Sequence, residues 1–330
     1  MMARKLAASV ESWPIRGSFR IARGAKTEAR VVVAEIAASG IIGRGECVPY
    51  ARYGEMVESV ADAIAALQHD IARGMTREEL QTRLGAGAAR NALDCALIDF
   101  EAKASGKRAF AILGLPEPKP ARTAYTLSLD SPDAMGEAAS EALAKGYRLL
   151  KLKIAGGEDL ARVAAVRKAA PEAQLIADAN EGWTPGDLVR LTPELAKLGV
   201  ALIEQPLKAS EDEGLSGFAS PVPLCADESC HTRTDLPRII GRYSHINIKL
   251  DKAGGLTEAV ALATEARAKG LKLMVGCMVS TSLSMAPAML LAGMAEFVDL
   301  DGPLLLARDR EPSLGYRGDV IEPPARELWG

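Results

Sequence analysis

Five short apolar runs between positions 149 and 251 each carry charged residues at or near their carboxyl ends: LLKLKI at 149–154, LIADAN at 175–180, ALIEQP at 201–206, LCADES at 224–229 and INIKLD at 246–251. A strand of a parallel sheet is buried on both faces and is normally almost wholly apolar. The charged positions follow one another at intervals of 22 to 26 residues, about the length of one strand–helix unit. This spacing predicts that the charges lie together at the carboxyl ends of successive parallel strands.

Alanine-rich amphipathic segments separate these runs, and the alternation extends along the chain in both directions. The apolar spacing predicts helices over 132–145, 159–170, 185–198 and 257–268. Eight strands alternating with helices over ~190 residues predict an α/β fold, a closed TIM-like (β/α)7β barrel rather than an open sheet. The expected strands are 124–129, 149–154, 175–179, 201–204, 224–226, 245–250, 272–276 and 296–300.

The first part of the chain has a different pattern, which predicts an α+β domain that caps the barrel. Strand-like runs at 29–37 and 40–48 flank a glycine-containing turn and predict a hairpin. A helix is expected over 88–105, because Leu93, Leu97 and Phe100 share one face and Gly106 can end it. A proline-rich linker at 115–120 separates a capping domain, 1–120, from the barrel, 121–309. We expect the tail, 310–330, to pack back on the capping domain.

Composition excludes several classes of function. The chain has 330 residues, 48% of them hydrophobic, and a net charge of −3. It has no basic stripe interleaved with aromatic residues, which argues against nucleic acid as a partner. It has no apolar run of about 18 residues and no signal-peptide pattern at its start, so we expect no membrane segment. Five scattered cysteines do not suggest disulfides or zinc and favour a cytoplasmic location. The sequence leaves room for a homo-oligomer.

The carboxylates at the strand ends predict a metal site. Asp178, Glu204 and Asp227 come from three neighbouring strands and cannot lie together without a compensating charge. Carboxylates without cysteine or histidine favour magnesium or manganese over zinc, and we expect one Mg²⁺ per subunit. A single charged residue near a strand end is usually a solvated loop residue, and a buried ion pair is another alternative. Charged groups in five consecutive units, with acids in the middle and lysines outside, favour a site.

The lysines on either side of these carboxylates predict proton transfer. Lys153 ends the strand before the acids, and Lys249 ends the strand after them. A metal that holds a substrate carboxylate stabilises the enediolate formed when the α-proton leaves. The base must be neutral near pH 7, and we expect nearby Lys151 and partial burial to lower its pKa. With one lysine on each face of the substrate, the expected reaction is 1,1-proton transfer, that is, racemisation or epimerisation.

These residues resemble the muconate-lactonising subgroup of the enolase superfamily, and within it the dipeptide epimerases. The resemblance runs nearly end to end and implies that Lys153 and Lys249 are the catalytic bases and that Asp178, Glu204 and Asp227 bind Mg²⁺. It implies that Asp299 and Asp301, in DLDGP at 299–303, hold the α-ammonium group of a dipeptide. It also implies that the loops 21–24 and 50–55 cap the site. The further substrate contacts that it implies are Arg23, for a glutamate carboxylate, Tyr53, Thr126, Lys151 and Cys277.

The resemblance implies an isomerase that epimerises L-Ala-D/L-Glu dipeptides and serves the reuse of cell-wall peptides. The rival enzymes share the metal and the lysines: N-acylamino acid racemase, o-succinylbenzoate synthase and muconate cycloisomerase. Their substrates have no free α-ammonium group, so Asp299 and Asp301 argue against them. A non-catalytic barrel that binds a small acid would not need two opposed lysines. A metal-assisted hydrolase is disfavoured, because no histidine motif or metal-bridging carboxylated lysine stands out.

Overall fold

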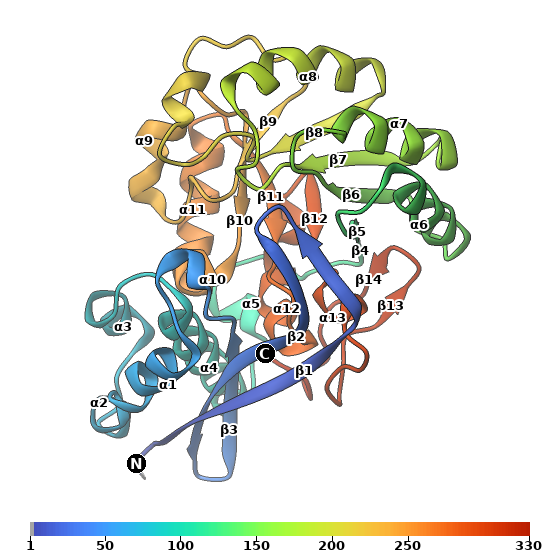
Figure 1. The fold of residues 1–330 in the computed structure, drawn as a ribbon. Helices are drawn as coiled ribbons and strands as arrows, with labels where there is room; N and C mark the ends of the chain where they lie inside the picture. The colour runs from blue at the N-terminus through green and yellow to red at the C-terminus, as the bar shows by residue number, and fades with distance from the viewer. Residues whose placement is uncertain (1–2) are drawn as a thin grey trace.

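The computed structural model describes residues 3–330, and its central feature is an eight-stranded parallel sheet. The strands neighbour one another in chain order, and a backbone hydrogen bond of 2.7 Å from Ala124 to Val298 joins the two edges into a barrel. The predicted barrel is confirmed, and each predicted strand overlaps an observed one (Figure 1). The strands are β5 (Tyr125–Leu127), β6 (Leu149–Lys153), β7 (Gln174–Asp178), β8 (Val200–Glu204), β9 (Leu224–Ala226), β10 (His245–Ile248), β11 (Lys272–Gly276) and β12 (Phe297–Asp299).

Helices surround the strands, and all four predicted helices are present: α6 (Pro132–Ala144), α7 (Asp159–Ala169), α8 (Pro185–Lys197) and α11 (Leu256–Ala268). The connection between β8 and β9 differs from the other connections between barrel strands. It contains no α-helix, only the 3₁₀ turn η2 (Asp212–Leu215). Pro206 lies just after β8, and Pro221 and Pro223 lie just before β9, so prolines border this connection at both ends. The remaining barrel connections contain η3 (Arg233–Asp235), α9 (Leu236–Ile239), α10 (Leu250–Ala253), α12 (Ser282–Ala288), η4 (Met289–Met294) and α13 (Gly302–Leu305).

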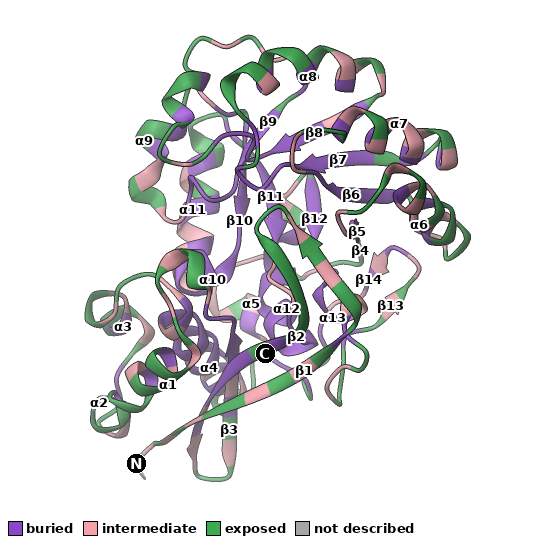
Figure 2. Ribbon diagram, viewed as in Figure 1, coloured by how far each residue is buried: buried purple, intermediate pink, exposed green. Residues whose placement is uncertain are grey.

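Alternation along the strands separates the interior of the barrel from its outer core. In β6, Leu150 and Leu152 pack outward in the large core shared with the helices. Leu149 faces inward, in a small cluster with one residue from nearly every strand. Since side chains two apart share a face, Lys151 and Lys153 face inward above Leu149. Figure 2 shows the barrel strands as mostly buried, although β7 and β11 each begin with an exposed residue. The inner cluster is Ala124, Leu149, Ile176, Leu202, Cys225, Met274 and Phe297.

The N-terminal region forms an antiparallel sheet packed on helices. The predicted hairpin is confirmed as β2 (Gly24–Ala38) paired with β3 (Ile41–Cys47), while β1 (Lys5–Ile21) was not predicted. A Cβ on Gly45 would lie 2.1 Å from the carbonyl oxygen of Ala92, which belongs to helix α4 (Ala88–Ser105). Only glycine therefore allows β3 to pack this closely on α4. The helices are η1 (Ala51–Tyr53), α1 (Val57–Ala65), α2 (Gln68–Ala72), α3 (Arg77–Arg83), α4 (Ala88–Ser105) and α5 (Ala109–Ile112).

Helix α4 and the end of the chain connect the N-terminal region to the barrel. Trp329 donates a hydrogen bond from Nε1 to the Cys95 carbonyl at 3.1 Å, which places the C-terminus on α4. The strands β13 (Tyr316–Arg317) and β14 (Val320–Ile321) pair with β4 (Ala121–Arg122). In Figure 1 the arm formed by β1 and β2 reaches from this region toward the carboxyl ends of the barrel strands. Within residues 3–330, no helix is long and apolar enough to cross a membrane.

A buried carboxyl group lies where the N-terminal region meets the barrel. Asp251 Oδ1 accepts hydrogen bonds from the Val48 backbone N–H at 2.9 Å and from Asn91 Nδ2 at 2.8 Å. Burial raises the pKa of Asp251 from 3.8 to about 7. A carboxyl group whose pKa is raised by folding stabilises the protein fully below its unfolded pKa and loses that contribution as the pH rises through its folded pKa.

We therefore predict that Asp251→Asn changes stability in a pH-dependent way. The variant cannot ionise, so its Tm relative to the wild-type Tm should be higher at pH 8 than at pH 5. A shift of roughly 2–4 °C is expected for each kcal/mol of difference. Thermal unfolding of both proteins at the two pH values measures this. A Tm difference that is independent of pH would show that the carboxyl group does not titrate in this range.

Candidate active site

A cavity of about 660 Å³ lies at the carboxyl ends of the barrel strands, beneath the arm of β1 and β2 and the loop that contains η1. Barrel enzymes carry their active sites at this end. Ten of the twelve predicted site residues line the cavity: Arg23, Tyr53, Thr126, Lys151, Lys153, Asp227, Lys249, Cys277, Asp299 and Asp301. The other two, Asp178 and Glu204, are fully buried in the barrel, where they contact Lys151.

The carboxylates at the strand ends are held by lysines. Lys151 Nζ lies 2.7 Å from Glu204 Oε2, 2.8 Å from Asp299 Oδ2 and 3.1 Å from Asp178 Oδ2. Lys153 Nζ is 2.6 Å from Asp178 Oδ2. In this arrangement each acid turns toward an ammonium group, and among the described residues no three acidic, cysteine or histidine side chains converge on one point.

The chemistry of these donors nevertheless suits an oxygen-preferring divalent cation. Glu204 Oε2 and Asp227 Oδ1 are buried and accept no well-formed hydrogen bond, although each lies 2.7 Å from a lysine Nζ. Their contacts with the lysines are therefore mainly Coulombic. A metal cation between the carboxylates could supply the same attraction.

Lys153 and Lys249 lie on opposite sides of the barrel. Lys153 ends β6, and Lys249 follows β10 directly, four positions round a closed sheet of eight strands. Lys249 Nζ is 2.6 Å from Asp227 Oδ2. The predicted opposition of the two lysines across the carboxylates is therefore present in the structure.

Carboxylates shift the pKa values of two buried lysines, Lys249 and Lys151. Burial by itself lowers the pKa of Lys249, but the negative charge of Asp227 raises it well above the usual range. The pKa of Lys151 is raised in the same way, by Asp299, Glu204 and Asp178. The prediction for the catalytic base weighed the charge of Lys151 and partial burial, and it did not include the carboxylates that surround Lys151.

The two aspartates after β12 differ in their surroundings. Asp301 Oδ2 accepts a hydrogen bond of 2.6 Å from the Thr126 backbone N–H, which ties the end of β12 to β5. Burial and the charge of Asp299 raise the pKa of Asp301 to about 7. Asp299 Oδ1 is buried and has no hydrogen-bond partner among the described residues. These oxygens present negative charge to the cavity without a full set of donors. Cys277, which follows β11, lies beside them in the cavity wall.

Two arginines fasten the N-terminal arm and loop to the mouth of the barrel. Arg23 Nη2 is 2.7 Å from Glu228 Oε1, and Arg23 Nη1 donates to the Asn180 carbonyl at 2.7 Å. Arg52 makes a two-point contact with Glu181, at 2.9 Å and 2.8 Å. The Tyr53 ring packs edge-on against His231, with ring centroids 4.5 Å apart. These contacts close one side of the cavity. The predicted role of Arg23 as a substrate contact stays a prediction.

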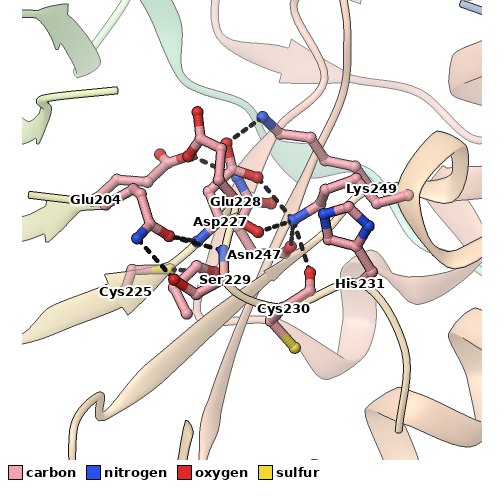
Figure 3. A network of polar contacts seen from close by, with 12 residues as sticks. Glu204, Cys225, Asp227, Glu228, Ser229, Cys230, His231, Asn247 and Lys249 are labelled. Atoms are coloured by element: carbon pink, nitrogen blue, oxygen red, sulfur yellow. Dashed lines mark hydrogen bonds and ion pairs between the residues drawn. The ribbon is translucent and has the colours of Figure 1, made fainter. Parts of the chain in front are cut away.

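Several residues that complete the site were not predicted from the sequence, and Figure 3 shows some of them. Asn247 donates from Nδ2 to Glu204 Oε1 at 2.8 Å. Its position two residues before Lys249, on the same face of the strand, could have indicated it. Lys252 is fully buried, 2.7 Å from Asp227 Oδ1 and 2.9 Å from the carbonyl oxygens of Cys230 and Asn247. No spacing pattern distinguishes Lys252 in the sequence.

The chain matches two families along most of its length. Residues 3–114 match the family described as "Mandelate racemase / muconate lactonizing enzyme, N-terminal domain", and residues 134–316 match "Enolase C-terminal domain-like". The chain is 50% identical to "L-Ala-D/L-Glu epimerase" of Escherichia coli (strain K12), over 93% of this chain and 95% of the relative. It is 48% identical to "N-acetyl-D-glutamate racemase" of Pseudoalteromonas sp., over 91% and 95%.

Solved structures agree with these relatives. An enolase family member from Agrobacterium tumefaciens with homology to dipeptide epimerases, with bound sodium and L-Ala-L-Glu, is 51% identical and superposes with a TM-score of 0.96 over 99% of this chain and 100% of the other. A dipeptide epimerase from Enterococcus faecalis V583, complexed with Mg and L-Leu-L-Tyr, is 28% identical with a TM-score of 0.91 over 98% of each chain.

The buried contacts of Lys252 yield a prediction about stability. In Lys252→Met, Asp227 Oδ1 and the carbonyl oxygens of Asp227, Cys230 and Asn247 lose a buried ammonium group, and the free energy of unfolding should fall by about 3–5 kcal/mol. Lys272→Met is the control. Lys272 pairs with Glu296 at 3.0 Å on the surface, where such a pair contributes less than about 1 kcal/mol. Urea unfolding measures both. Equal losses in the two variants would contradict the role given to Lys252.

Proposed function

Because this chain belongs to the mandelate racemase / muconate lactonizing enzyme family of the enolase superfamily, we propose that it is an isomerase that epimerises L-Ala-D/L-Glu dipeptides. The observation that carries the proposal is the placement of Lys153 and Lys249 on opposite sides of a buried carboxylate cluster. A site that only binds a small acid has no need of a base on each face of its ligand.

Asp178, Glu204 and Asp227 would hold one Mg²⁺ per subunit. When bound, the metal supplies positive charge that stabilises the negative charge developing on the substrate carboxylate as the α-proton leaves. The dipeptide complex from Enterococcus faecalis contains Mg, which supports this choice.

The two lysines perform the proton transfers. One lysine, as the free amine, removes the α-proton of the C-terminal residue from its own face. The other lysine, as an ammonium group, returns a proton from the opposite face, so the configuration at the α-carbon inverts. The carboxylate partners Asp178 and Asp227 hold the two Nζ atoms at the mouth of the barrel.

The amino end of the substrate would meet Asp299 and Asp301. Asp299 Oδ1 is buried without a partner among the described residues, and Asp301 is held by Thr126. A primary ammonium group supplies the donors that these oxygens lack. Thr126, Cys277 and Lys151 would complete the wall around it, while Tyr53 and Arg23 close the cavity from the N-terminal side.

Racemisation of an N-acylated glutamate is the second candidate, because the relative from Pseudoalteromonas sp. is nearly as similar to this chain as the Escherichia coli relative. Both names include glutamate, so the two candidates differ at the amino end of the substrate. An acyl group brings a carbonyl oxygen close to Asp299 and Asp301 and offers no positive charge, which favours the dipeptide.

We also propose that residues 1–120 form a capping domain, that residues 121–309 form the catalytic barrel, and that residues 310–330 join the cap. The hydrogen bond from Trp329 to Cys95 supports the placement of the tail. The five free cysteines favour action in a reducing cytoplasm, where the enzyme would serve the reuse of cell-wall peptides.

The two-lysine mechanism predicts that loss of either lysine abolishes epimerisation but leaves exchange of the α-proton by the other lysine. With L-Ala-L-Glu in D₂O and Mg²⁺, the wild-type enzyme should form L-Ala-D-Glu carrying deuterium at the α-carbon. Lys153→Ala and Lys249→Ala should each abolish epimerisation, because one face of the substrate then has no proton donor or acceptor. The remaining lysine should still exchange the α-proton on its own face. Proton NMR and mass spectrometry follow both processes, and near wild-type epimerisation by Lys249→Ala would contradict the mechanism.

The contact with the amino group predicts a change in substrate preference. Asp301→Asn keeps the size of the side chain and removes its charge, so kcat/KM for L-Ala-L-Glu should fall about 10- to 100-fold. The kcat/KM for N-acetyl-L-glutamate should change little, because that substrate has no cation to lose a partner. The measurement is the ratio of the two kcat/KM values in both proteins. An unchanged ratio would show that Asp301 does not bind the ammonium group.

A further inference from the structure

The backbone of Lys249 is held by the short helix α10 that follows it. The Lys249 carbonyl oxygen accepts hydrogen bonds from the backbone N–H groups of Lys252 at 3.1 Å and Ala253 at 3.0 Å. Asp227 contacts Lys249 Nζ, but this carboxylate is also a proposed metal ligand, so its contact cannot be the only support of the lysine. The position of α10 therefore sets where the Lys249 side chain enters the cavity.

Helix α4 of the N-terminal region lies against α10 and fixes it through a buried hydrogen-bond set (Figure 1). The acceptor is Asp251, which lies in α10 two residues after Lys249. Asp251 Oδ1 accepts from Asn91 Nδ2 of α4 at 2.8 Å and from the backbone N–H of Val48, just after β3, at 2.9 Å. The side chains of Asn91 and Asp251 are buried, so water does not compete for these bonds.

Two glycines after α10 allow the two helices to approach this closely. Arg90 of α4 donates from Nε to the Gly254 carbonyl at 3.0 Å. Gly254 has a φ of +77°, and a Cβ there would lie 2.8 Å from the Cα of Ala86, just before α4. A Cβ on Gly255 would lie 2.5 Å from the Cβ of Asp94. The glycine pair that follows Lys249 in the sequence thus serves the contact with α4.

The backbone that follows the other base, Lys153, is held by residues of the barrel. Asp159, at the start of α7, accepts hydrogen bonds from the Ala155 backbone N–H at 2.9 Å and from Trp183 Nε1 at 2.8 Å. These three residues all lie between β6 and β8. The backbone supports of the two proposed bases therefore come from different parts of the chain.

From these contacts we propose that Asp251 and Asn91 are positioning residues for the proton transfer made by Lys249. The inference rests on the proposed function and adds that the N-terminal region supports one of its two bases, besides covering the cavity. Neither side chain lines the cavity, so both would act through the placement of α10. A displacement of about 1 Å at a reacting group can slow a reaction about 100-fold, so loss of this support should be visible in the rate.

The test measures exchange of the α-proton by one lysine at a time, with L-Ala-L-Glu and L-Ala-D-Glu in D₂O and Mg²⁺. In the Lys153→Ala background, Asp251→Ala should slow the exchange by Lys249 about 10- to 100-fold. In the Lys249→Ala background, the same change should alter the exchange by Lys153 less than about twofold, as for independent sites. Asp251→Asn keeps the oxygen that accepts both hydrogen bonds and should restore the exchange by Lys249.

Two further variants separate this role from a general loss of structure. Asn91→Ala should give the same asymmetry from the side of α4, and it carries the test if Asp251→Ala does not fold. Asp99→Ala is the matched control. Asp99 is a buried acid of the same helix, but it accepts from the backbone N–H groups of Arg44 at 2.8 Å and Gly330 at 2.7 Å. This control should change neither exchange reaction.

Three results would contradict these roles, each in a different way. Equal slowing of both exchange reactions by Asp251→Ala and Asn91→Ala would overturn the proposal, and so would unchanged exchange by Lys249. If the wild-type enzyme epimerises L-Ala-L-Glu but Lys153→Ala exchanges no α-proton, Lys249 is not an independent base and the proposal also fails. A wild-type enzyme that epimerises no dipeptide would refute the proposed function itself.

Discussion

The ammonium group of Lys151 lies within 3.1 Å of carboxylate oxygens from three other strands, and the mouth of the barrel is organised around this contact. Three buried carboxylates repel one another and are strongly destabilising unless positive charge lies between them. Lys151 supplies that charge from the neighbouring strand, with Lys153, Lys249 and Lys252 on either side. The site is therefore a balanced set of charges inside the barrel and not a collection of independent surface groups.

The apolar cluster beneath these charges makes the balance possible. One apolar side chain from nearly every strand fills the bottom of the barrel, which leaves the upper positions of the same faces to the charged groups. Because side chains alternate along a strand, the residues between the charges point outward and pack on the helices. The same strands thus supply the outer hydrophobic core and the polar interior, and a one-residue shift in register would exchange the two.

The N-terminal region completes the cavity by contacts of a different kind. Arg23 and Arg52 bind acids at the mouth of the barrel and hold the arm and the loop in place. These charged contacts connect the N-terminal region to the carboxyl ends of the barrel strands.

The sequence by itself determined the barrel, its eight strands and the charged groups at its mouth. Strand alternation and the length of a strand–helix unit are local and repetitive, so they place Lys153, Asp178, Glu204, Asp227 and Lys249 at one edge without knowledge of any contact. Tertiary structure alone decided which charges pair. The sequence analysis treated Lys151 as a source of repulsion toward Lys153, whereas three carboxylates surround it and raise its pKa. The acids that contact Arg23, the role of Lys252 and strand β1 were not predicted either. Each of these depends on segments far apart in the chain, whose approach is set by strand order and packing and leaves no periodic signal in the sequence.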